Sequence, residues 1–168
     1  NQKNTMSENP SDQHTKTLLE SYNNIGIINT FEKNHFPSKY DIKTILENVK
    51  ELLFPGFFGK EYIKETDIPF LTGKRIRALH EKLPHEISKC LSWNQDTPKK
   101  SIDEKAEYIT QMFLKKLPSL RQTLRDDAQA IYQWDPAAKN IIEVILSYPG
   151  FQAITTYRIA HFFYQYNI

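Results

Sequence analysis

Cysteine, glycine and net charge are all scarce in this 168-residue chain, and each scarcity excludes a class of protein. The single cysteine, Cys90, cannot form a disulfide framework, so a reducing compartment fits and we expect a cytoplasmic protein. Five glycines are few for a protein rich in sheet or in short repeats. A net charge of +2 gives no electrostatic reason to expect a nucleic acid or a membrane surface as a partner.

Long apolar runs and the common catalytic motifs are absent as well. No run reaches the roughly 18 apolar residues of a membrane helix, and the polar N-terminus lacks the layout of a signal peptide. The sequence holds no GxGxxG, GxxxxGK[ST], GxSxG or HExxH motif and no Cys/His cluster. We therefore expect no metal, no resident cofactor and no nucleophilic triad.

Apolar residues recur at helical spacing along most of the chain, without sustained strand-like alternation. With 39% hydrophobic and 25% charged residues, the chain suits one globular domain with a real core. This pattern predicts an all-α fold, a multi-helix bundle of orthogonal or antiparallel helices. Residues 1–15 are polar and are predicted to be a disordered arm, and residues 16–168 to be the helical domain.

Capping residues and prolines predict where the helices begin and end. We expect one helix over Lys16–Lys33, and further helices to begin at the capping boxes of Ser38 and Ser101 and at Pro118. Pro84 lies inside a helical pattern, so a kink or a break into two helices is expected near it.

The stretch from Asp127 to His161 combines two acids, two prolines and two helical patterns. Asp135 precedes Pro136, an arrangement that favours a helix start with Asp as its N-cap. Pro149-Gly150 is expected to end that helix, and an apolar stripe at helical spacing follows over Phe151–Tyr166.

Two pairs of polar residues in this stretch are candidates for chemistry. Asp127 and Asp135 are eight residues apart, which places them near one helix face if the helix persists. The residue types alone favour a structural interpretation, with Asp127 a solvated acid and Asp135 a cap. Arg158 and His161 are three residues apart and share a helix face, and a structural role is again favoured.

The spacing D-x-Q-A-x-x-x-x-DPA, followed by GF-x-A-x-x-x-YRIAH, resembles the N-terminal helical domain of serine O-acetyltransferase. The upstream LLFPGFFG, residues 52–59, is similar to the longer-armed bacterial branch of that family. Family members transfer an acetyl group from acetyl-CoA to L-serine, the first committed step of cysteine synthesis. The resemblance therefore implies an acyltransferase.

The resemblance implies a role for one residue of the chain. The Asp of DPA, here Asp135, would reach into the serine pocket and pair with the substrate ammonium; its roughly four lone-pair sites also allow a cap. Asp127, Arg158 and His161 match the motif and are interpreted as structural. The family often has His where this chain has Gln152, so no proton transfer is assigned to that position.

The family's catalytic His–Asp pair and its acetyl-CoA groove lie in a left-handed β-helix of hexapeptide repeats, which this sequence does not contain. We therefore expect no catalytic residue in these 168 residues, and the site of the co-substrate acetyl-CoA outside them. The resemblance also implies a homo-oligomer (trimer or hexamer), L-cysteine as feedback inhibitor, and O-acetylserine sulfhydrylase as a candidate partner. That partner docks on a C-terminal tail ending in Ile, and Ile168 falls in predicted helix and is not interpreted as that tail.

Two hypotheses remain open from the sequence. In the first, the chain is the N-terminal piece of a serine acetyltransferase, inactive alone, which supplies oligomer contacts and part of the serine site. In the second, it is a non-enzymatic oligomerisation or regulatory helical module related to that enzyme. Hexapeptide repeats containing a His beyond Ile168 in the natural coding frame would favour the first.

Overall fold

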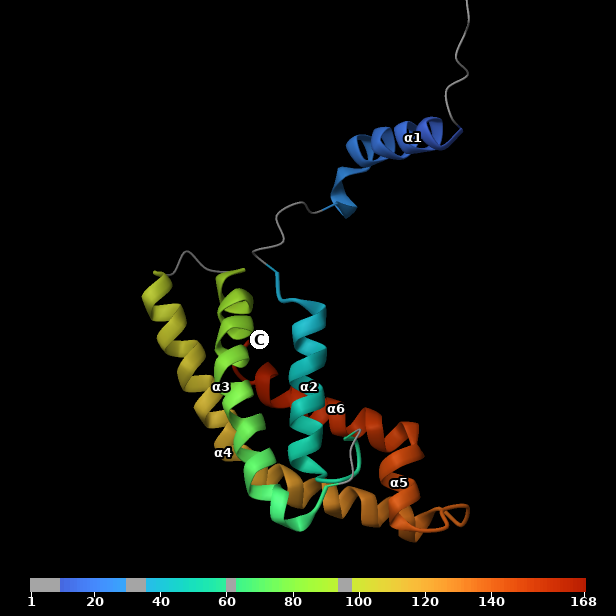
Figure 1. Cartoon of the computed structure of the whole chain (residues 1–168), viewed down its shortest axis with the longest axis vertical. Coiled ribbons are helices and arrows are strands. Elements are labelled where there is room, and N and C mark those ends of the chain that lie inside the picture. The colour runs from blue at the N-terminus through green and yellow to red at the C-terminus, as the bar shows by residue number, and fades with distance from the viewer. Residues whose placement is uncertain (1–9, 30–35, 60–62, 94–97) are drawn as a thin grey trace, which may run out of the picture. The chain divides into compact units, whose positions relative to one another are not determined.

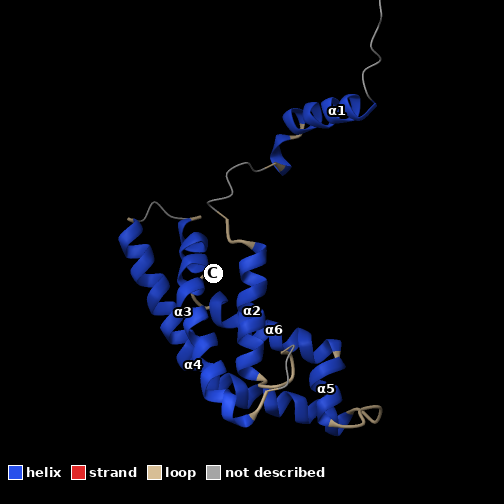
Figure 2. Cartoon of the chain, viewed as in Figure 1, coloured by secondary structure: helices blue, strands red, loops and turns tan. Residues whose placement is uncertain are grey.

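The computed structural model describes residues 10–29, 36–59, 63–93 and 98–168 (Figure 1). Helices joined by loops make up these residues, and no strand occurs among them (Figure 2). The prediction of an all-α fold is therefore confirmed. The chain forms two compact units, residues 1–34 and residues 35–168.

The first unit contains helix α1, Pro10–Asn24, and the short 3-10 helix Gly26–Ile28. The helix begins inside the segment 1–15 predicted as disordered, because Pro10 suits the first turn of a helix. The α-helix predicted over Lys16–Lys33 ends at Asn24, beside Gly26, a residue that weakens helix interiors. Residues 1–9 and 30–35 lie outside the described part of the chain.

The second unit is built on three helices: α2 (Lys39–Leu53), α3 (Ile68–Ser92) and α4 (Lys99–Trp134). The short 3-10 helix Glu65–Asp67 precedes α3, which packs against both α2 and α4. The Ser38 hydroxyl caps α2 by accepting a hydrogen bond from the Asp41 N–H at 3.2 Å, so the predicted start of this helix is confirmed. Gly56 follows the helix with φ +85°, a conformation that favours glycine.

The prolines inside α3 and α4 do not divide these helices. Helix α3 continues through Pro84, and α4 continues through Pro118, where a new helix was predicted to start. The predicted start at Ser101 is also wrong, because α4 begins two residues earlier. Buried leucines precede both prolines by one residue, so packing holds each helix together across the lost hydrogen bond. Figure 1 shows α4 changing direction between its yellow and orange parts, as expected for a proline kink.

Two further helices complete this unit, the short α5 (Ile141–Ser147) and the longer α6 (Pro149–Tyr164). Phe113 of α4 is fully buried, and its ring centroid lies 5.2 Å from that of Phe162 and 4.7 Å from that of Phe163. At the other end of α6, the ring of Phe151 meets that of Phe54 at 5.6 Å. Helix α6 therefore closes the core, with aromatic contacts to α4 and to the end of α2.

We expect Phe113→Ala to lower the free energy of unfolding by about 3–5 kcal/mol, because it removes a fully buried ring and leaves a cavity beneath α6. Chemical denaturation followed by circular dichroism measures the change. Tyr40→Ala is the control, since Tyr40 is 75% exposed and its truncation should change stability by less than about 1 kcal/mol. Equal denaturation midpoints for the two variants would contradict this view of the core.

Candidate functional site

Asp135 ends α4 instead of beginning the next helix, which corrects the prediction from the Asp-Pro pair. Its backbone N–H donates to the Ile131 carbonyl at 3.0 Å, as the last helical bond of α4. Its backbone is extended, with φ −102° and ψ 106°, the conformation that a following proline imposes. Proline therefore acts here on the residue before it, and the chain turns away from the helix axis.

The Asp135 carboxylate closes this turn. Its Oδ1 accepts a hydrogen bond from the Ala137 N–H at 2.8 Å, and its backbone carbonyl accepts from the Ala138 N–H at 3.0 Å. This is the local side-chain to backbone bonding that Asp favours in turns. The side chain is half-buried, and Ala137 supplies the sole backbone donor that it meets in the described part of the chain.

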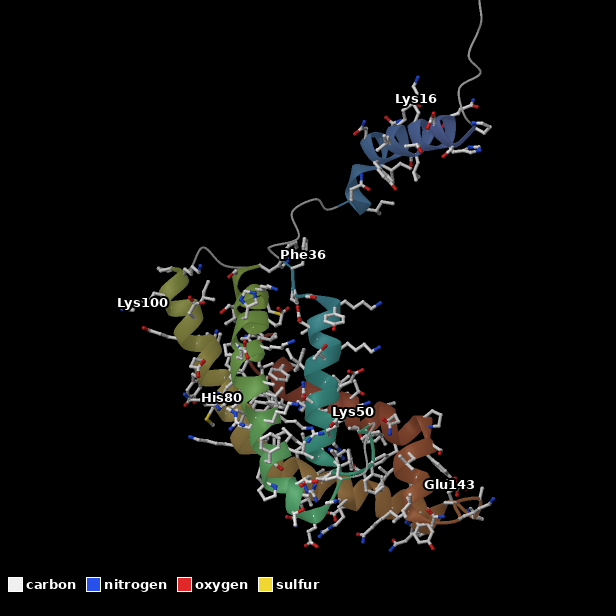
Figure 3. The ribbon with its side chains drawn as sticks, viewed as in Figure 1. Lys16, Phe36, Lys50, His80, Lys100 and Glu143 are labelled. Atoms are coloured by element: carbon white, nitrogen blue, oxygen red, sulfur yellow. The ribbon has the colours of Figure 1, made fainter. Side chains whose placement is uncertain are left out.

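The cap predicted for Asp135 is supplied by Asn140. The Asn140 side chain accepts from the Glu143 N–H at 2.9 Å and begins α5. Glu143 in turn accepts from the Lys139 N–H at 3.0 Å (Glu143 is labelled in Figure 3). The signal was present in the sequence, because Asn followed three residues later by Glu is the spacing of a capping box. The Asp135 carboxylate is consequently not used to cap a helix.

Tyr148 lies beside Asp135, and sequence reasoning did not identify it. The carboxylates of Asp135 and Glu143 lie near enough to the phenol to influence its pKa. Burial raises the pKa of the Tyr148 phenol, and the neighbouring Asp135 and Glu143 carboxylates raise it further. The phenol therefore keeps its proton at neutral pH.

Asp127 and Arg158 form a bidentate ion pair between α4 and α6. Arg158 donates from Nε to Oδ2 of Asp127 at 2.5 Å and from Nη2 to Oδ1 at 2.7 Å. The hydrogen bond to Asp127 raises the pKa of Arg158, although desolvation acts in the opposite direction. The ion pair is partly exposed. It joins two helices through residues that lie 31 positions apart in the sequence.

His161 shares a helix with Arg158 but does not join this ion pair. Its ring stacks between those of Tyr157 and Tyr164, with centroid distances of 5.7 and 6.3 Å. Its Nε2 lies 3.4 Å from the Gln165 side-chain nitrogen. His161 therefore belongs to an exposed row of three rings along α6.

Gln152, at the position where the family often has His, bridges three helices. Its side-chain N–H donates to the Ile145 carbonyl of α5 at 2.6 Å, and its Oε1 accepts from the Lys50 ammonium of α2 at 3.0 Å. Burial lowers the pKa of Lys50, while the nearby Glu47 raises it (Lys50 is labelled in Figure 3). Both ends of the amide are thus used in holding α5 and α6 to α2.

Residues 10–29, 36–59, 63–93 and 98–168 contain no group of three or more His, Cys, Asp or Glu side chains that could hold a metal ion. No helix within these ranges combines the length and the apolar character that crossing a membrane requires.

We expect Asp127→Asn to lower the free energy of unfolding by about 1–3 kcal/mol, because Arg158 would lose its charge partner in a partly buried position. Asp126→Asn is the matched control: the neighbouring Asp126 pairs with Arg125 on the surface, where such pairs contribute about 0–1 kcal/mol. Urea denaturation of both variants measures the difference. If the two substitutions cost the same, the ion pair does not fasten α6 to α4.

Known proteins of one family match the region of the chain that contains these residues. A family model described as "Serine acetyltransferase, N-terminal" matches residues 70–156, just over half of the chain. A plasmid-encoded serine acetyltransferase of Synechococcus elongatus is 32% identical over 143 residues, which covers 79% of this chain and 43% of that protein. A second serine acetyltransferase of the same organism is 49% identical over 47 residues, 28% of this chain and 19% of that protein.

A third relative, a serine acetyltransferase of Bacillus pumilus, is 48% identical over 42 residues, 25% of this chain and 19% of that protein. The chain thus spans less than half the length of these curated relatives. The family model covers most of α3, all of α4 and α5 and the first half of α6, including Asp127, Asp135 and Tyr148. By this match the chain belongs to the serine acetyltransferase N-terminal family.

Proposed function

We propose that this chain is the N-terminal helical part of a serine O-acetyltransferase and that Asp135 forms part of its serine site. The observation that carries the proposal is the state of the Asp135 carboxylate. It is half-buried at a turn, it accepts from Ala137 through one oxygen, and it caps no helix because Asn140 does so. A carboxylate held in this way has lone pairs left for a ligand.

The chemistry of serine matches such a carboxylate. Serine presents an ammonium group with three N–H donors, and a charge-assisted hydrogen bond to Asp135 would orient the amino acid. In the proposed reaction the serine hydroxyl attacks the thioester carbonyl of acetyl-CoA while a general base removes the hydroxyl proton. The products are O-acetyl-L-serine and CoA. The base and the acetyl-CoA site are assigned to a catalytic domain outside these 168 residues.

The second proposed contribution of the chain is oligomer assembly. Tyr157 and Tyr164 are 64% and 73% exposed and, with His161 between them, form a row of stacked rings along α6. Exposed aromatic side chains in a row are typical of protein interfaces. We propose that neighbouring copies of the enzyme, a cytoplasmic trimer or hexamer, cover this row. L-cysteine as inhibitor and O-acetylserine sulfhydrylase as partner belong to the same proposal.

In the enzyme that contains this chain, we expect Asp135→Asn to raise KM for serine by about 10- to 100-fold, because an ammonium loses its charged partner. KM for acetyl-CoA should stay unchanged. Steady-state kinetics with each substrate varied in turn gives both constants. Asparagine retains an oxygen for the Ala137 N–H, so the turn is preserved. Asp126→Asn is the control, and an unaltered KM for serine in the Asp135 variant would remove Asp135 from the site.

We expect residues 1–168 alone to release no CoA from acetyl-CoA and serine, because the proposed base and acetyl-CoA groove lie elsewhere. A thiol-reactive dye detects CoA, and the longer enzyme assayed in parallel is the positive control. CoA release from the isolated chain above the uncatalysed rate would contradict the division of roles. If the natural coding frame encoded no hexapeptide-repeat domain, the non-enzymatic module would become the better interpretation.

A further inference from the structure

We propose that a cleft between α4 and α6 binds a phosphate group, either as free phosphate or as part of a small phosphate monoester. The cleft has a volume of about 240 Å³. Its lining includes Lys116 and Leu120 of α4 and Arg158, His161 and Phe162 of α6. The inference goes beyond the proposed function, because none of these residues is assigned to the serine site.

The size and the charge of the cleft suit a small anion. Its volume lies below the roughly 300–1,000 Å³ of sites for drug-sized ligands, so the ligand is small. The buried Leu120 and the partly buried Phe162 give it apolar surface between the two helices. Among the described residues that line the cleft, Lys116 and Arg158 are cationic and none is acidic. A negatively charged ligand therefore matches the sign of the lining.

Asp127 holds Arg158 in place and leaves donors of the guanidinium group unused. Arg158 gives two of its five N–H groups to Asp127, one from Nε and one from Nη2. Three N–H groups remain, including both on Nη1, and the side chain is 35% exposed, so a ligand in the cleft can reach it. Because the ion pair already fixes the guanidinium, binding costs it little further conformational freedom.

Lys116 supplies the positive charge that the protein does not balance. The charge of Arg158 is balanced by Asp127, whereas no acid in the described part of the chain pairs with the Lys116 ammonium. A neutral imidazole at His161 adds one N–H donor to the same cleft. Three donor groups on two helices match a phosphate group, which has three acceptor oxygens and a charge of about −1.5 to −2 at pH 7. A carboxylate offers two oxygens and a single charge.

The test is a two-dimensional NMR titration of the 168-residue chain with sodium phosphate and, separately, with glycerol 3-phosphate. The ionic strength is kept constant, because salt alone screens exposed charges. We expect saturable shifts of amide resonances beside the cleft, and Lys116→Gln to weaken binding by about fivefold or more, because it removes a charged donor. Lys115→Gln is the matched control: it makes the same charge change at an exposed residue outside the lining, and should alter binding by less than about twofold. Circular dichroism checks that both variants are folded.

The outcomes distinguish a built site from general attraction to a basic surface. The absence of saturable shifts at the cleft, or equal weakening by Lys115→Gln and Lys116→Gln, would overturn the proposal. Sodium acetate that binds as tightly as phosphate at the same ionic strength would overturn the assignment to phosphate. Saturation of the cleft by glycerol 3-phosphate supports a monoester as the ligand, and saturation by sodium phosphate alone supports the free anion.

Discussion

The attachment of α6 to α4 is the constraint on which the geometry of the candidate site depends. Asp127 lies two turns before the end of α4, and Arg158 lies in the middle of α6, so their bidentate pair closes a 31-residue segment. Asp135, the residue proposed to bind the serine ammonium, lies inside that segment. The buried ring of Phe151 contributes more to stability than a partly exposed ion pair, about 1.5–3 kcal/mol against about 1 kcal/mol or somewhat more. The forked geometry of Arg158 contributes something different, because it fixes the register of one helix on the other.

Along α3 and α4, tertiary packing and the local effect of proline compete, and the prolines show where each prevails. Pro84 and Pro118 lie in long helices whose apolar faces are buried on both sides of them, and there packing prevails over the lost hydrogen bond. Pro136 follows Asp135 at the exposed end of α4, where little burial opposes the restriction that proline places on the preceding residue. The same residue type therefore bends a helix in the core and ends one at the surface. Periodicity alone could not distinguish these cases, because burial depends on elements far away in the sequence.

The sequence predicted the helical class, the cap at Ser38 and the residues of the Asp127–His161 motif, all of which depend on short spacings. It did not predict which of these residues contact one another. Lys50 and Gln152 are 102 positions apart, and no local pattern pairs them. The approach of Tyr148 to Asp135 likewise depends on how α5 packs against α4. The cap at Asn140 is a different case, because the spacing of Asn140 and Glu143 is a local signal in the sequence. The prediction did not use this signal, since Asp135-Pro136 offered a competing helix start.

In the proposed function, a helical chain contributes a carboxylate to a reaction whose base is assigned to another domain. The Ala137 N–H holds Asp135 from within the same chain, and the ion pair that closes the segment also lies within that chain. The proposed acceptor for the ammonium is thus formed without help from another domain. The hydrogen bond between this carboxylate and the Ala137 N–H lies at the surface, so a ligand can reach the carboxylate. The proposal thus divides the selection of the amino acid and the activation of its hydroxyl between domains, and it assigns to the helical domain an anchor for the ammonium end of the substrate.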